Sequence, residues 1–146
     1  MQIGVESARA VENKRIFVVE ADEIIRSALQ FMLHDENETH EMASLEQAYD
    51  KGREWKPDLV LLGLSFVEEA GADLLNDVKT RLPGVKILLV ADTPEQPLVQ
   101  TGLATGAEGV LVKPITIEAV RGKVDIVLGR RALPMASLDA LAAGGR

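Results

Sequence analysis

Five short strand-like runs, spaced along this 146-residue chain, constrain its fold more than any other feature. Each run is followed by a segment in which apolar residues recur with helical spacing. This alternation predicts a single α/β domain with a doubly wound, open, five-stranded parallel sheet and helices on both faces. The runs are RIFVV at 15–19, THEMA at 39–43, DLVLLG at 58–63, KILLV at 86–90 and GVLV at 109–112.

The intervening segments carry signals for where helices begin and how well they form. Asp22 and Ser44 stand where N-caps belong, immediately before two of the helical segments. An acidic stretch at 67–73 is expected to be a loop, followed by a helix containing Leu74, Leu75, Val78 and Leu82. The helix expected at about 95–105 should be weak, because it contains Pro97 and Gly102.

Composition narrows the range of functions and partners. The chain has 16 Lys and Arg against 23 Asp and Glu, a net charge of −7 that argues against nucleic-acid and anionic-membrane partners. With no cysteine, thiol catalysis and cysteine-based zinc sites are excluded. The apolar runs are too short to cross a bilayer and residues 1–13 show no secretion signal, so a cytoplasmic protein is expected. We expect a domain at 14–130 between an N-terminal extension, 1–13, and a C-terminal tail, 131–146.

The residues just after each strand are the ones to inspect for function, because ligands of such sheets bind beyond the strands' carboxyl ends. A phosphate-binding loop after the first strand would need glycine or hydroxyl residues with free amides. The chain instead has Glu20 and Asp22 there, whose carboxylates repel phosphate. Nucleotide binding in that manner is therefore disfavoured, and we expect no cofactor.

Several stretches resemble the receiver domain of bacterial two-component response regulators. The resemblance covers roughly residues 14–130, and its most specific part is the glycine-rich run that leads into Lys113 and Pro114. It implies the strand order 2-1-3-4-5 with five flanking helices in three layers, a flavodoxin-like receiver fold. The matching stretches are RIFVVEAD, WKPDLVLLGL, LLNDVKTRLP, KILLVAD and ATGAEGVLVKPITIEAV.

The same resemblance implies a phosphorylation site that has lost its main parts. The family's phospho-accepting aspartate falls at Gly63, and the second acid of its metal-binding pair falls at Ala21. Its phosphate-contacting hydroxyl falls at Ala91 and its aromatic switch residue at Val110. The matching residues that remain are Glu20, Lys113 and Pro114.

Metal binding is not expected, and Glu20 and Asp22 are only weak candidate ligands, because Mg²⁺ takes its protein charge from several carboxylates. We hypothesise that Lys113 neutralises the site by an ion pair with Glu20 or Asp22. His34 and His40 lie in an acidic stretch that offers a second, weaker metal candidate. A solvated loop is the simpler interpretation of that stretch, because no helical spacing pairs the two histidines.

The resulting hypothesis is a pseudo-receiver without enzyme activity, which acts in signalling by phosphorylation-independent contact with a protein partner or with a second copy of the chain. Two alternatives remain open: a sensor of a small molecule or anion in the vacated acidic pocket, and a phosphorelay receiver with a displaced acceptor. The resemblance implies an interaction face on the fourth helix, fifth strand and last helix. Its candidate residues are Leu98, Thr101, Gly102, Val110, Val112 and Ala119.

Overall fold

The computed structural model describes residues 14–130, which form one five-stranded, wholly parallel sheet in the order β2-β1-β3-β4-β5. Both the doubly wound fold and the strand order predicted from the sequence are confirmed. The segments 1–13 and 131–146 lie outside the described residues. The strands are β1 (Arg15–Val19), β2 (Glu38–Met42), β3 (Leu59–Gly63), β4 (Lys86–Ala91) and β5 (Gly109–Val112).

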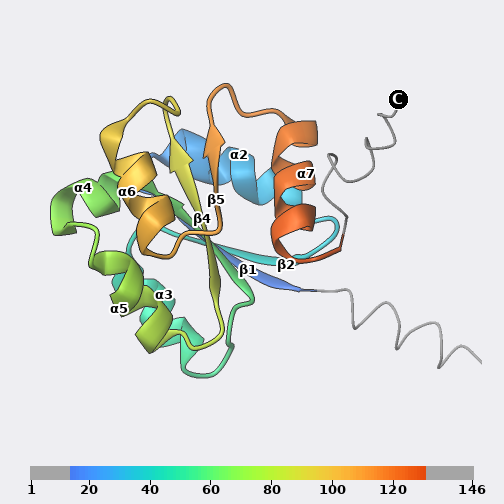
Figure 1. Ribbon diagram of the computed structural model, residues 1–146. Helices are drawn as coiled ribbons and strands as arrows, with labels where there is room; N and C mark the ends of the chain where they lie inside the picture. Colours follow the sequence, from blue (N-terminus) through green and yellow to red (C-terminus); the bar gives the residue numbers. More distant parts are fainter. Residues whose placement is uncertain (1–13, 131–146) are drawn as a thin grey trace, which may run out of the picture.

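Helices cover both faces of the sheet and make a three-layer domain (Figure 1). Two of them, α2 and α7, pack on one face, and the other four pack on the opposite face. No helix among residues 14–130 has the length and apolar content needed to cross a membrane. The helices are α2 (Glu23–Leu33), α3 (Leu45–Gly52), α4 (Leu64–Ala70), α5 (Leu74–Arg81), α6 (Pro97–Thr105) and α7 (Ile117–Val127).

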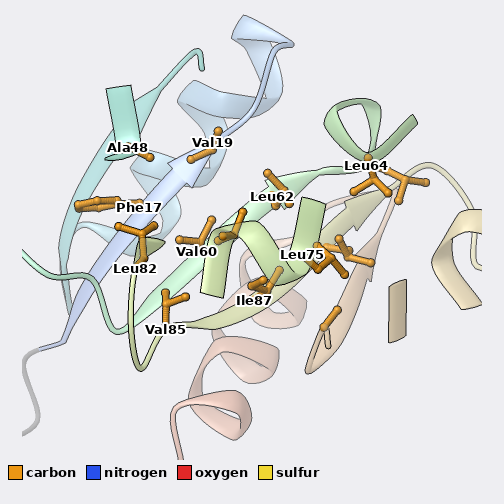
Figure 2. Close-up of a cluster of buried hydrophobic side chains, with 14 of the residues drawn as sticks. Phe17, Val19, Ala48, Val60, Leu62, Leu64, Leu75, Leu82, Val85 and Ile87 are labelled. Carbon is orange, nitrogen blue, oxygen red and sulfur yellow. The ribbon is translucent and has the colours of Figure 1, made fainter. Parts of the chain in front are cut away.

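The two faces of the sheet bury separate apolar clusters, because successive side chains along a strand point to opposite sides. In β1, Phe17 and Val19 belong to the cluster under α3 to α6, which Figure 2 shows. Ile16 and Val18 belong to the cluster under α2 and α7. All five residues of β3 are buried, as expected for a central strand covered on both sides.

The segment after β3 differs from the sequence expectation. Most of the acidic stretch at 67–73, expected to be a loop, belongs to α4, which begins directly after Gly63. Leu64 and Val67, three positions apart, bury their side chains against the core and hold this short helix in place. The chain turns at Gly71, where φ is +94°, and α5 follows. The part of the chain described here therefore has six helices rather than the five implied by the resemblance.

The two residues expected to weaken α6 have local roles instead. Pro97 occupies the first turn of the helix, where its missing N–H costs no hydrogen bond. Gly102 is buried, and a Cβ at this position would lie 2.6 Å from Cδ1 of Leu89 in β4. The absence of a side chain at Gly102 is therefore what allows α6 to pack closely on the sheet.

Candidate functional site

The carboxyl ends of the strands surround an open cavity of about 290 Å³. The structure brings together there most of the strand-end residues singled out from the sequence, whereas Gly63, Val110 and Pro114 do not line the cavity. Four carboxylates and one ammonium group are in the lining. The lining residues are Glu20, Ala21, Asp22, Leu64, Ser65, Glu68, Val90, Ala91, Asp92, Gln96 and Lys113.

The Glu20 carboxylate fills the space beside Gly63. Glu20 follows β1, is only 8% exposed, and its Oε2 accepts a hydrogen bond of 2.9 Å from the backbone N–H of Asp22. A Cβ built on Gly63 would lie 2.6 Å from Oε1 of Glu20. The backbone of Gly63, with φ −61° and ψ 136°, suits any residue. A side chain at this position would therefore have to displace the Glu20 carboxylate, whereas the backbone conformation would accept one.

Ala21 and Ala91 have no side-chain group that could bind phosphate or metal, and Asp22 serves as a helix cap. Ala21 is exposed, and Ala91, the last residue of β4, is buried. Asp22 caps α2, as predicted, because its Oδ1 accepts hydrogen bonds from the N–H groups of Ile24 and Ile25 at 2.9 and 3.2 Å. The carboxylate of Asp22 is thus committed through one oxygen to the helix.

Lys113 pairs with a different carboxylate from the two that we hypothesised. Its Nζ lies 2.8 Å from Oδ1 of Asp92, and no ion pair with Glu20 or Asp22 forms. Strand register explains this pairing. Ala91 and Val112 are register partners in the neighbouring strands β4 and β5, so the residues that follow them, Asp92 and Lys113, lie side by side. The hydrogen bond to Asp92 raises the pKa of Lys113; partial burial opposes this, and the charges of Asp92, Glu20 and Asp22 add to it. The peptide bond between Lys113 and Pro114 is cis.

Six residues of the cavity lining were not among the site residues predicted from the sequence: Leu64, Ser65, Glu68, Val90, Asp92 and Gln96. Ser65 and Glu68 are in α4, and Glu68 reaches the cavity because that helix begins at the strand end. The Oε1 atom of Gln96 accepts hydrogen bonds from the N–H groups of Asp92 and Thr93 at 2.8 and 3.2 Å, and so holds the loop after β4. The only sequence signal for these residues was that they lie a few positions from the end of a strand. Glu68 reaches the cavity because residues 64–70 form a helix, and the sequence did not predict that helix.

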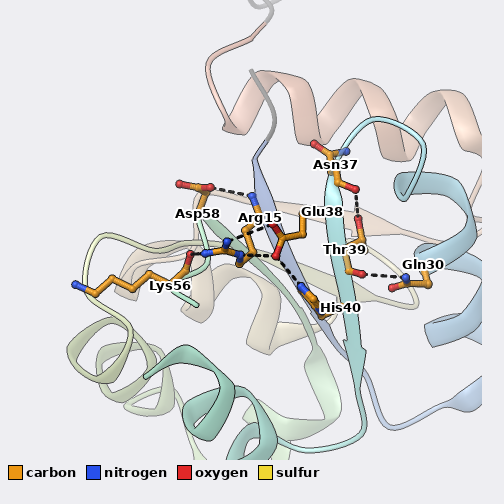
Figure 3. Close-up of polar contacts among 8 residues, drawn as sticks. All are labelled: Arg15, Gln30, Asn37, Glu38, Thr39, His40, Lys56 and Asp58. Carbon is orange, nitrogen blue, oxygen red and sulfur yellow. Dashed lines mark hydrogen bonds and ion pairs between the residues drawn. The ribbon is translucent and has the colours of Figure 1, made fainter. Parts of the chain in front are cut away.

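The two histidines lie at separate places away from the cavity. His40 is in β2, where its Nε2 lies 2.9 Å from Oε2 of Glu38. Glu38 also accepts hydrogen bonds from Arg15, at 2.6 and 3.2 Å (Figure 3), and these bonds, with that of His40, hold the pKa of Glu38 below its ordinary value. His34 lies beside Asp35 at the end of α2. Within residues 14–130, no group of three or more acidic or histidine side chains could hold a metal ion.

The residues of the candidate interaction face differ in exposure. Thr101 and Ala119 are exposed, and Leu98, Val110 and Val112 are half-buried. Leu98 and Val110 pack partly against the core beneath α3 to α6. Gly102 does not belong to this surface, because it is buried against Leu89; the inclusion of Gly102 in the face was wrong.

Curated bacterial proteins include relatives of this chain in sequence. The transcriptional regulatory protein LnrK of Bacillus subtilis is 25% identical over 109 residues, which are 73% of this chain and 50% of that protein. Protein CcdB of the same organism is 28% identical over 117 residues, 79% of this chain and 98% of that protein. The chain thus spans half the length of the first relative and nearly all of the second.

Solved structures share the fold at lower sequence identity. A response regulator from Thermotoga maritima aligns with a TM-score of 0.72 at 19% identity, covering 80% of this chain and 98% of that one. The Vibrio cholerae chemotaxis protein CheY4 aligns with a TM-score of 0.69 at 22% identity, covering 79% and 98%. These alignments agree with the sheet order and helix placement described above.

The model of the response regulator receiver domain family matches residues 16–125, from the first strand to the last helix. This span includes all of β2 to β5, all of β1 except Arg15, and every residue that lines the cavity. By this match and by its fold, the chain belongs to the response regulator receiver domain family.

Proposed function

We propose that this domain is a pseudo-receiver, which acts in signal transduction through protein contacts that do not depend on phosphorylation and which has no enzyme activity. The observation that carries the proposal is the position of the Glu20 carboxylate, against the bare Cα of Gly63. The place from which an acceptor side chain would project is already filled by a group held in a hydrogen bond to Asp22.

The rest of the cavity supports the same proposal. Aspartyl phosphorylation needs a carboxylate nucleophile, a divalent cation and a hydroxyl group that contacts the new phosphate. Ala21 and Ala91 lack the side-chain oxygens for the second and third of these. Lys113, the cation that would contact phosphate, is bonded to Asp92 instead.

Partner binding is assigned to the face formed by α6, β5 and α7. The nine residues of α6 and the four of β5 include no charged side chain, although charged residues make up 27% of the chain. Thr101 and Ala119 are exposed there beside the half-buried Leu98 and Val112. Interface cores are depleted in charge in the same way, so this face suits a protein partner or a second copy of the chain.

The first experiment asks whether the chain accepts phosphate. The full chain is incubated with acetyl phosphate and Mg²⁺, and its intact mass is measured. We expect no mass increase corresponding to a phosphoryl group. A stoichiometric increase would refute the proposal and would favour a receiver with a displaced acceptor.

The second experiment asks whether the face formed by α6, β5 and α7 makes the contacts. Oligomeric state is measured by light scattering, and partner binding by capture on the immobilised chain, with and without a phosphodonor. Thr101→Arg and Ala119→Arg should weaken the contact. Ser27→Arg, at an exposed position of α2 and outside the three elements of the proposed face, is the matched control. Contacts that appear only with the phosphodonor would contradict the proposal.

A further inference from the structure

The charge of the cavity is not balanced by the groups that line it. Four carboxylates, those of Glu20, Asp22, Glu68 and Asp92, share the lining with one ammonium group, that of Lys113. This ammonium group is bound to Asp92 at 2.8 Å. The three remaining carboxylates have no cation of the lining within ion-pairing distance, so the cavity favours a positively charged occupant and repels anions.

Glu20 is the residue that points most directly to a ligand. It is more than nine-tenths buried and borders the cavity. One oxygen accepts the N–H of Asp22, and the other has no hydrogen-bond partner among residues 14–130. No ion pair within that range includes Glu20. A buried carboxylate without a cation is unfavourable, and a cationic group from outside the domain would compensate its charge.

The spacing of the carboxylates favours an organic cation over a metal ion. No three of them converge closely enough to hold a metal ion in the described part of the chain. A guanidinium group has five N–H donors spread over a planar fork, and it is more weakly hydrated than an ammonium ion. It can therefore reach acceptors that are too far apart for one metal. The cavity volume, about 290 Å³, is at the lower limit of small-molecule sites, roughly 300–1,000 Å³, and suits a side-chain head group.

We infer that this cavity receives a basic side chain, an arginine guanidinium in the first instance, from the protein that binds the domain. The inference rests on the proposed function, because it names the chemistry of the contact made by a domain that is not phosphorylated. Three residues of the cavity lining also flank elements of the proposed interaction face in the chain. Asp92 and Gln96 precede α6, and Lys113 follows β5, so a partner on that face lies beside the opening.

The test uses two small probes of nearly the same shape, methylguanidinium and its neutral analogue methylurea. Each is titrated into the ¹⁵N-labelled full chain at constant ionic strength, and backbone amide shifts are followed by NMR. We expect methylguanidinium, and not methylurea, to shift the amides of Asp22, Leu64 and Asp92 along a saturable curve. Equal shifts with both probes, or none with either, would overturn the inference. Saturation of the same amides by MgCl₂ at a lower concentration would also overturn it, in favour of a metal.

Charge-removing variants locate the site. Glu20→Gln should weaken methylguanidinium binding by at least about tenfold. Glu68→Gln is a second variant that does not alter the buried carboxylate, and it should weaken binding by about threefold or more. Glu69→Gln, next to it on α4 but outside the cavity lining, is the matched control and should change binding by less than about twofold. Unchanged binding in both cavity variants would refute the assignment.

Partner binding separates this inference from the proposed function. If Thr101→Arg abolishes the partner contact and Glu68→Gln leaves it unchanged, the contact-based function stands and the role of the cavity is refuted. If the partner contact requires a phosphodonor, the proposed function fails, whatever the methylguanidinium titration shows. If both variants weaken a phosphodonor-independent contact, both conclusions are supported.

Discussion

Substitution of Gly63 by alanine tests the central geometric feature of this domain. The new methyl carbon would lie 2.6 Å from Oε1, 3.0 Å from Cδ and 3.1 Å from Oε2 of Glu20. Since ordinary contacts begin near 3.4 Å, the carboxylate must move away. The N–H of Asp22 then loses its charged acceptor, a hydrogen bond that contributes about 1.5–3 kcal/mol.

An opposing contribution comes from the unfolded chain. Alanine is less flexible than glycine there and suits the backbone angles of Gly63, which stabilises the folded state by about 0.4–1 kcal/mol. The net expectation for Gly63→Ala is a loss of about 1–2 kcal/mol in the free energy of unfolding. In the Glu20→Ala background the carboxylate that blocks the new methyl group is absent. There, Gly63→Ala should stabilise the domain by about 0.4–1 kcal/mol.

The assay is urea unfolding of the four chains of this double-mutant cycle, followed by circular dichroism and by the fluorescence of Trp55, the single tryptophan. The effect of Gly63→Ala should differ between the two backgrounds by about 2 kcal/mol. Gly71→Ala is the control. Its φ is +94° and no atom lies within 4 Å of a Cβ built there, so the loss of stability that it causes should not depend on Glu20. Additivity within about 0.5 kcal/mol at Gly63 would refute the reasoning.

Three further outcomes are expected. Gly63→Asp alone should take up no phosphate from acetyl phosphate and Mg²⁺, because the second metal ligand and the hydroxyl group are still absent; intact-mass measurement checks this. Arg15 and His40 hold the pKa of Glu38 below its ordinary 4.5, so this stabilisation is present above that pH and lost as pH falls through the folded pKa. Glu38→Gln should therefore lose stability at neutral pH and show a flatter stability profile between about pH 5 and pH 3, measured by urea unfolding. Gly102→Ala should lower the free energy of unfolding by about 1–3 kcal/mol, because its Cβ meets the buried Leu89; an unchanged melting temperature would contradict this.

Local sequence signals were sufficient for the five strands and for every described helix except α4, whereas the strand order in the sheet came from the resemblance. The cap at Asp22 is local: its side chain bonds to amides two and three residues ahead. The burial of β3 on both faces could be read from its unbroken apolar run. The segment after β3 was misjudged because its acidic residues resemble a loop, whereas Leu64 and Val67 gain enough from burial in the core to hold a helix.

The pairing of charges at the site could not be predicted in the same way. Lys113 was expected to contact Glu20 or Asp22, which follow β1, but β5 is next to β4 and is separated from β1 by two strands. The pairing with Asp92 follows from the register of β4 with β5. Gly102 was placed on the interaction face because it lies in the helix that the resemblance assigns to that face, and only the packing of α6 on Leu89 shows that it is buried.

The sequence by itself determined that this is a doubly wound parallel domain with a glycine where its resemblance to receivers places an acidic nucleophile. Those features depend only on residue type and on spacing along the chain, and both can be read without knowing any distance in the folded structure. The tertiary structure alone decided that the Glu20 carboxylate fills the space beside Gly63, that Asp92 holds Lys113, and that Glu68 turns into the cavity. These contacts join residues from different strands and helices, so their geometry exists only when the sheet and its helices are assembled.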